Sequence, residues 1–283
     1  MTDTTPAPIA LFVYRRLDHT RLTVEALRDN DLAARSRLYV FCDGPRSEEE
    51  AGSVAAVRDF AHGISGFESV EVVERGENMG LARSIIAGVT QVVAAHGRVI
   101  VVEDDLVTSP FFLRYMNDGL TTYHHDDRVA SIHGYIYPVA RPLPETFFLR
   151  GADCWGWATW DRAWTHFEPD ADILLKQLKA RGLEHAFDLD GSYGFTDMLR
   201  AYAKGLNNSW AIRWHASMYL REMLTLYPGE SMVNNIGLDS SGTHCTTTSE
   251  YLVDVRDTPI TVGGISVEEN TEARKIGVNF FRK

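Results

Sequence analysis

The sequence predicts an α/β fold in which helices flank a mostly parallel mixed sheet. The first observation is a regular alternation in the first half of the chain. Short runs rich in Val and Ile predict strands at residues 9–14, 38–42, 70–73 and 98–102. Helix-like segments separate these strands, at residues 19–28, 48–62 and 81–95. Repeated strand–helix–strand units form right-handed crossovers on a parallel sheet, which gives a Rossmann-like half. The second observation is that no Pro/Gly/Ser-rich linker follows, so a single domain is expected.

The second half of the chain has a different pattern. Strands are expected at residues 129–136 and 146–149, and helices at about 172–179 and 195–203. We expect one domain over residues 1–255, with a nucleotide-binding half at about 1–127 and an acceptor half at about 128–255. Residues 256–283 are expected to be a tail that packs on this domain.

Composition excludes several classes of function. A formal charge of −11 argues against a nucleic-acid partner, because binding to a phosphate backbone needs a basic surface. No apolar run approaches the roughly twenty residues of a membrane helix, and the start of the chain lacks the pattern of a signal peptide. The three cysteines are widely spaced and form no CxxC pair, which argues against a zinc ribbon and a disulfide framework. We therefore expect a cytoplasmic protein without a transmembrane segment.

Three carboxylates stand at the end of the fourth predicted strand. Val99 to Val102 run directly into Glu103, Asp104 and Asp105. Ligands of open α/β sheets bind at the carboxyl ends of the strands, and clustered carboxylates repel one another unless a cation lies among them. Oxygen ligands suit Mg²⁺ or Mn²⁺, the ions that accompany phosphates. The sequence thus predicts a divalent metal that holds a diphosphate, and neither a GxGxxG nor a GxxxxGK[ST] phosphate loop is present to do so instead.

The alternative is that one carboxylate caps the next helix and the others are solvated. Ser109 followed by Pro110 already has the pattern of an N-cap and a first helical residue, so a second cap is not needed.

Two further groups of residues have a structural and a functional interpretation. Trp157, Trp160 and Trp164 follow the i, i+3, i+7 spacing of one helix face and predict a core stripe, while Trp155 or Trp157 could instead line a sugar site. The HHDD run at residues 124–127 is expected to be a solvated helix end rather than a metal site, and His133 to be structural.

Four stretches together resemble a known family: ERGENMGLARSI, VIVVEDDLVTSPFFLRYM, DCWGWATWDRAW and the segment from SWAIRWHASMYL to NIGLDSSGTHC. They look like bacterial GT-A-fold glycosyltransferases of the family-2 type, which are similar to N-acetylglucosaminyltransferase I. The resemblance spans nearly the whole chain. It implies a nucleotide-sugar donor, most simply a UDP-sugar, Mn²⁺ or Mg²⁺ as cofactor, and inverting transfer to a carbohydrate or small-molecule acceptor.

The resemblance also implies roles for individual residues. Asp105 matches the metal-binding Asp of the family, and Glu103 and Asp104 would contact ribose or sugar and support the metal. Asp43, at the end of the second strand, would accept from N3–H of uracil, although the DGP that it begins is also turn chemistry. Further donor contacts would come from Arg16, for which Arg15 is an equal match, and from Asn78, Gly80, Arg83 and His244.

The general base is the point at which this sequence departs from the family pattern. Relatives place an Asp directly before SWAIRW, whereas this chain has Asn208, and a neutral amide cannot accept the acceptor's proton. Asp239, inside the matched motif, is the first candidate, Asp197 the second and Glu222 the third. The alternatives to a glycosyltransferase are a nucleotidyltransferase and a non-catalytic sugar-binding or partner-binding module.

Overall fold

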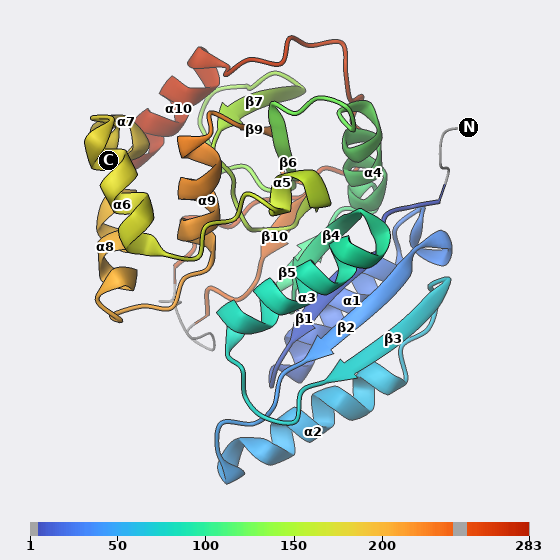
Figure 1. Cartoon of the computed structure of the whole chain (residues 1–283). Helices are drawn as coiled ribbons and strands as arrows, with labels where there is room; N and C mark the ends of the chain where they lie inside the picture. Colours follow the sequence, from blue (N-terminus) through green and yellow to red (C-terminus); the bar gives the residue numbers. More distant parts are fainter. Residues whose placement is uncertain (1–4, 240–247, 283) are drawn as a thin grey trace.

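The computed structural model describes residues 5–239 and 248–282 (Figure 1). Its main sheet has eight strands in the order β3-β2-β1-β4-β8-β6-β9-β7, and β5 and β10 form a separate pair. The strands are β1 (Ile9–Val13), β2 (Arg37–Cys42), β3 (Ser69–Glu74), β4 (Arg98–Glu103), β5 (Leu106–Thr108), β6 (Val129–His133), β7 (Thr146–Arg150), β8 (Trp157–Trp160), β9 (Leu224–Pro228) and β10 (Val233–Asn235).

Helices lie on both faces of the sheet, as Figure 1 shows for α3 and α1. They are α1 (Leu17–Arg28), the 3₁₀ turn η1 (Ala33–Arg35), α2 (Glu48–His62), α3 (Leu81–His96), α4 (Phe112–Thr122), α5 (Asp161–Trp164), α6 (Ala171–Ala180), α7 (Glu184–Phe187), α8 (Phe195–Ala203), α9 (Ala211–Leu220) and α10 (Thr271–Phe281). In the described part of the chain, no helix is both long enough and apolar enough to cross a membrane.

The sheet is mixed, as predicted. Strands β3, β2, β1 and β4 run parallel, and β8 runs antiparallel to both β4 and β6. Every inner residue of β4, Val99 to Val102, is buried, because helices cover both of its faces. The fold class predicted from the sequence is therefore confirmed. Because β8 joins β4 to β6, the two predicted halves share one continuous sheet.

The tryptophan stripe differs from the prediction. Trp157 and Trp160 belong to strand β8, and the helix begins only at Asp161. Side chains of a strand alternate between faces, so Trp157 packs with Trp164 on one side of the sheet while Trp160 joins the core on the other side. The predicted helix over these residues is wrong, although all three side chains are core residues as expected.

The start of α4 also differs from the prediction. The helix begins at Phe112, two residues later than a cap at Ser109 would place it. Ser109 Oγ accepts from the N–H of Phe111 at 3.1 Å, and its carbonyl accepts from Phe112 at 3.1 Å. Ser109 and Pro110 thus form the turn that leads into the helix.

The helices of the second half form their own layer. In Figure 1, α6, α7 and α8 gather on one side with α9, and these helices share a small apolar core. The C-terminal segment runs back along the sheet, where Glu269 forms a parallel bridge with Phe148, and it ends in α10. Phe281 of α10 reaches the cavity described below.

Candidate active site

A cavity of about 540 Å³ opens where β1, β2 and β4 end. Parallel strands bring their carboxyl ends to one edge, so the residues after each strand meet there. One part of the lining, here called the acidic wall, consists of Arg16, Glu103, Asp104 and Asp105. The three acidic residues are those singled out in the sequence, and the structure brings them together with Arg16.

Arg16 is the counter-ion of the acidic wall. Its Nη2 donates to Oδ1 of Asp104, and it also lies 2.7 Å from Oδ2 of Asp105. Burial lowers the pKa of Arg16, but the charges of Asp104 and Asp105 outweigh that effect and raise it. Arg15, the equal match in sequence, lies 3.6 Å from Glu50 instead. The structure therefore favours Arg16 over Arg15 as the arginine that contacts the acidic wall.

The acidic wall carries more negative charge than one arginine neutralises. Burial, together with the charges of Asp105 and Asp104, raises the pKa of Glu103 to about 8. Burial also raises the pKa of Asp104 to about 6, although Arg16 pulls it downward. A cation placed there would relieve this repulsion.

The donor set fits a divalent ion that is bound partly by its substrate. Among residues 5–239 and 248–282, no group of three or more His, Cys, Asp and Glu side chains could hold a metal by itself. Mg²⁺ in phosphate sites needs only one or two carboxylates, because water and substrate phosphates complete its coordination. Asp105 and Asp104 satisfy that smaller requirement.

Gly237 brings the chain after β10 against the acidic wall. A Cβ atom on Gly237 would lie 2.1 Å from Oδ2 of Asp105 and 2.9 Å from Nη1 of Arg16. The backbone is held there because the N–H of Ile236 donates to the carbonyl of Asp105 at 2.9 Å. Only a residue without a side chain fits this approach.

Asp43 lines the cavity at the end of β2, and its carboxylate already has three backbone partners. Oδ1 accepts from the N–H groups of Gly44 and Met79, and Oδ2 from Gly80, all at 2.8–2.9 Å. These bonds tie the loop between β3 and α3 to the end of β2. Uracil recognition by Asp43 stays a prediction, and the structure adds a loop-holding role.

The other predicted donor contacts have different positions. Asn78 lines the cavity and donates to the carbonyl of Gly44 at 2.7 Å. Arg83 is exposed, is not among the lining residues, and donates to the carbonyls of Met79 and Asn78. His244 lies outside the described residues.

The structure does not bring the candidate bases Asp197 and Glu222 into the cavity. Asp197 is an exposed residue of α8 whose side chain pairs with Arg200 at 2.8 Å, and Glu222 is an exposed residue that lies 3.4 Å from Arg150. Asp239 is half-exposed and lies 3.2 Å from Nε2 of His19. Asn208 does line the cavity.

A second part of the lining, here called the aromatic wall, consists of Tyr135, Tyr137, Trp155, Tyr193 and Tyr251. Sequence reasoning identified only Trp155 among them. Ring centroids of Tyr135 and Trp155 are 4.7 Å apart, and Phe281 of α10 lies 4.9 Å from Tyr137 and 4.6 Å from Tyr193. Of the two tryptophans proposed for a sugar site, Trp155 lines the cavity, whereas Trp157 is fully buried in the core. Tyr135 and Tyr251 are 116 positions apart in the sequence, and the tyrosines between them follow no helix or strand periodicity. No local sequence pattern therefore predicts that they line one cavity.

Asp153 was also missed, although it stands in a quoted motif. It lines the cavity beside the aromatic wall, in the loop that enters β8. The cavity thus combines a carboxylate–arginine cluster, an aromatic surface and two separate carboxylates, Asp43 and Asp153.

Comparisons with known proteins add low-level structural similarities. No protein-family model matches the sequence, and a search of curated proteins finds no match. A mannosyltransferase from Pyrobaculum calidifontis in complex with GDP-Man and Mn²⁺ is similar at 15% identity and a TM-score of 0.33, over 48% of this chain and 39% of that one. TarS from S. aureus has 15% identity and a TM-score of 0.34, over 51% and 24% of the two chains.

A third similar structure is glucosyl-3-phosphoglycerate synthase from Mycobacterium tuberculosis, in complex with Mn²⁺, UDP and glucosyl-3-phosphoglycerate. It has 14% identity and a TM-score of 0.34, over 62% of this chain and 67% of that one. This chain thus spans well under half of the first two structures. Because the identities are low and the TM-scores lie below 0.5, the function proposed below is derived from the site itself. The resemblance to N-acetylglucosaminyltransferase I stays a prediction.

Proposed function

We propose that this protein is a GT-A glycosyltransferase that moves a sugar from a nucleotide-sugar donor, with UDP as its nucleotide, to a hydroxyl of the acceptor with inversion. One observation carries the proposal. A single cavity joins an acidic wall, suited to a metal-bound diphosphate, to an aromatic wall suited to sugar rings. Aromatic faces pack on the C–H faces of sugars and exclude water.

The acidic wall supports the donor assignment. Asp105, supported by Asp104, would hold Mn²⁺ or Mg²⁺, which when bound would neutralise the charge of the diphosphate as it leaves. Arg16 adds a fixed positive charge at the same place, and its Nη1 is buried without a hydrogen-bond partner among the described residues. A diphosphate oxygen is the kind of acceptor that this donor lacks.

The donor's base would lie near the end of β2. Asp43 and Asn78 are both in the lining there, held by the loop between β3 and α3. A carboxylate has about four lone-pair sites, so the three backbone bonds leave Asp43 one site that could accept from N3–H of uracil. This supports UDP as the nucleotide.

The test is nucleotide binding with and without metal. We expect UDP to bind with Mn²⁺ or Mg²⁺ and to bind far more weakly in EDTA, measured by calorimetry and thermal denaturation. At a nucleotide concentration 100 times Kd, binding adds about 2.7 kcal/mol to the free energy of unfolding, which a melting curve detects easily.

Turnover separates the proposal from its alternatives. A glycosyltransferase releases UDP from a UDP-sugar, whereas a nucleotidyltransferase releases pyrophosphate from a nucleoside triphosphate. A binding module would bind the donor and release neither product. Metal-independent UDP binding, or pyrophosphate as the product, would contradict the proposal.

A further inference from the structure

Outside the acidic wall, the cavity lining holds two carboxylates, Asp43 and Asp153. Three backbone N–H groups already hold Asp43, whereas Asp153 accepts from only one in the described part of the chain. Its Oδ1 accepts from the N–H of Cys154 at 3.0 Å, and Oδ2 lies 3.8 Å from Nε2 of His133. About a third of the side chain is exposed, and it faces the cavity lining. In the described part of the chain, no lysine or arginine forms an ion pair with it. Asp153 therefore has an oxygen that no strong donor occupies.

His133 stands behind Asp153 at the end of β6. Its side chain is fully buried, and among residues 5–239 and 248–282 neither ring nitrogen has a hydrogen-bond partner. Leaving a buried polar group unpaired costs about 1–3 kcal/mol. Burial lowers the pKa of His133, so its imidazole is neutral near pH 7 and carries a single N–H. Shortening the 3.8 Å separation between Nε2 and Oδ2 of Asp153 would give His133 the acceptor that it lacks among the described residues.

The groups that face Asp153 come from several elements. His133 belongs to β6 and His215 to α9, and the thiol of Cys154 is adjacent. The remaining titratable groups whose pKa values respond to the Asp153 charge are the phenols of Tyr135, Tyr137, Tyr193 and Tyr227. All of these groups are neutral near pH 7, so none of them supplies a cation to Asp153.

Asp153 and the acidic wall line the same cavity. Burial raises the pKa of Cys154, and the charges of Asp153, Glu103 and Asp105 raise it further. One side chain thus lies within electrostatic reach of both carboxylate groups. A sugar held between the two places would have its diphosphate at the acidic wall and its acceptor beside Asp153.

We infer that Asp153 is the general base of the proposed sugar transfer and that His133 is a positioning residue that orients its carboxylate through Nε2. This inference rests on the proposed function and deepens it, because it supplies the base that Asn208 cannot be. It also replaces the sequence-based candidates, since Asp197 lies outside the cavity lining and Asp239 pairs with His19.

The step balances without any further reactant. The acceptor O–H gives its proton to Oδ2 of Asp153 as its oxygen forms a bond to the anomeric carbon. The bond between that carbon and the diphosphate oxygen breaks, and its electron pair leaves with the nucleoside diphosphate. His133 keeps its own proton throughout, and its Nε2–H would donate to Asp153 once the 3.8 Å separation shortens to hydrogen-bond distance.

The first experiment uses water as the acceptor, because every nucleotide-sugar can be tested with it. The full chain with Mn²⁺ is given a panel of UDP-sugars and GDP-sugars, and release of nucleotide is measured for wild type, Asp153→Asn and Asp153→Glu. A positioned base is typically worth about 10²–10⁴-fold in rate. We expect Asp153→Asn to lose that factor, Asp153→Glu to retain more of it, and the Kd of UDP with Mn²⁺ to stay within about twofold in both. Asp126→Asn, far from the cavity lining, is the matched carboxylate control.

Each outcome has one interpretation. Normal release by Asp153→Asn overturns the inference, and so does a large loss in Asp239→Asn or Asp197→Asn that Asp153→Asn does not share. A loss of UDP affinity in Asp153→Asn also overturns it, because it would place Asp153 among the donor ligands. The calorimetric Kd, in turn, shows whether each variant is folded. If wild type binds neither UDP nor GDP with any metal, the proposed function itself fails and the inference fails with it.

The positioning role of His133 has its own readout. His133→Phe should lower the rate of nucleotide release and leave the Kd of UDP with Mn²⁺ within about twofold, because the base is then held less well while the donor site is unchanged. In the Asp153→Asn background, His133→Phe should cause no further loss of rate, because the two residues act together. Rescue of the wild-type rate by His133→Gln, which restores a donor, would support the inference, whereas an unchanged rate in His133→Phe would overturn the positioning role.

Discussion

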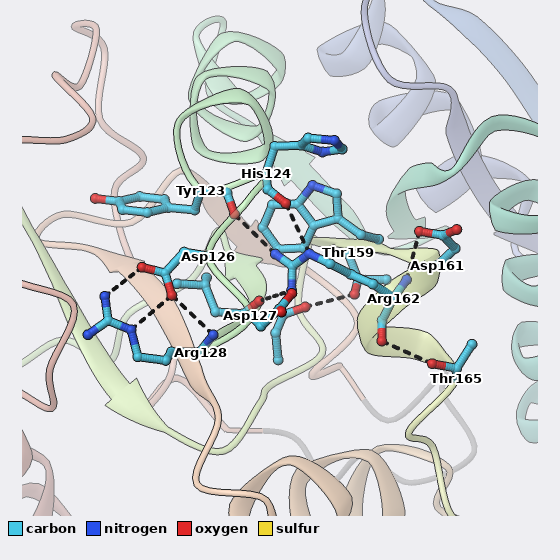
Figure 2. Close-up of polar contacts among 12 residues, drawn as sticks. Tyr123, His124, Asp126, Asp127, Arg128, Thr159, Asp161, Arg162 and Thr165 are labelled. Carbon is cyan, nitrogen blue, oxygen red and sulfur yellow. Dashed lines mark hydrogen bonds and ion pairs between the residues drawn. The ribbon is translucent and has the colours of Figure 1, made fainter.

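The two ends of strand β4 both carry acidic clusters, and the clusters differ in how their charges are balanced. At the carboxyl end, burial and mutual repulsion raise the pKa of Glu103 to about 8. At the other end, beside Arg98, lies the HHDD run, where hydrogen bonds from Arg128 lower the pKa of Asp126 (Figure 2). The HHDD run is thus a helix end satisfied by arginines, as its expected structural role required.

Arg162 contributes to the structural role of the HHDD run. Its guanidinium donates to the carbonyls of Tyr123, His124 and Val129 at 2.9–3.1 Å and lies 4.3 Å from the ring centroid of Trp160 (Figure 2). The guanidinium groups of Arg128 and Arg162 both donate to acceptors within the protein. The acidic wall, by contrast, keeps a buried donor on Arg16 without a partner among the described residues. Unbalanced charge, rather than the number of carboxylates, distinguishes the candidate active site.

The largest effect should come from Asp105. We expect Asp105→Asn to weaken UDP binding in the presence of Mn²⁺ by about 100-fold, because a charged interaction of this kind is worth about 3 kcal/mol. Calorimetry is the measurement, with Asp126→Asn as the control from the other end of β4. Equal Kd values for Asp105→Asn and wild type would show that UDP binding does not depend on a metal held by Asp105.

Arg162 should show the opposite pattern. Arg162→Ala leaves three carbonyl groups without their charged donor and should lower the free energy of unfolding by about 2–4 kcal/mol, with no change in the Kd of UDP. Urea denaturation checks the first part and calorimetry the second. Arg128→Ala breaks only an exposed pair and should cost less than about 1 kcal/mol. A loss of nucleotide affinity in Arg162→Ala would show that the two ends of the sheet are coupled.

Substitution of Asp43 tests whether this residue recognises uracil or only anchors the loop between β3 and α3. If Asp43 accepts from uracil, Asp43→Asn should weaken UDP binding by about 10-fold and leave GDP binding nearly unchanged, as expected for one hydrogen bond to a charged group. If the carboxylate only ties Met79 and Gly80 to β2, affinity for both nucleotides should fall equally. The ratio of the two Kd values decides.

The smallest expected effect concerns pH. Glu103 binds its proton more tightly in the folded protein, where its pKa rises from 4.5 to about 8, than in the unfolded chain. Folding therefore takes up a proton between these values, and the stability of the metal-free protein falls as pH rises through that window. With EDTA present, melting temperatures should drop from pH 6 to pH 8 in wild type and less in Glu103→Gln. Asp126→Asn should resemble wild type, because Asp126 is ionised at both pH values. An equal drop in Glu103→Gln would show that Glu103 is not the group responsible.

The sequence predicts the first half of the fold well because its signals are local. Strands β1, β2 and β4 are short apolar runs, β3 contains both Val and Glu, and helix α2 matches its predicted bounds. The WATW segment was assigned wrongly because i, i+3 spacing fits a helix face and also fits a short strand whose two tryptophans point to opposite sides. Only the partners of the strand, β4 and β6, decide between the two, and they are distant in sequence.

The sequence predicted those site residues that directly follow a parallel strand, and it did not predict the others. Asp105, Asp104 and Arg16 come directly after β4 and β1, so the rule for parallel sheets places them together. Asp153 precedes an antiparallel strand that the sequence did not reveal, and the aromatic wall draws on residues from β6 to the C-terminal region. Packing between segments that are distant in sequence brings these side chains together, so no local sequence pattern predicts their proximity.

The insertion of β8 between β4 and β6 has a consequence for how the chain is made. One edge of β4 stays unpaired until Trp160 has been synthesised, roughly 3–11 s after β4 itself at about 5–20 residues per second. During that interval the nascent chain exposes the unpaired edge of β4, a run of Val and Ile. Such an edge can pair with strands of other chains. Chaperone contact with the nascent chain should therefore be greatest while residues 104–160 are being added. It should fall once β8 pairs with β4 and closes that edge.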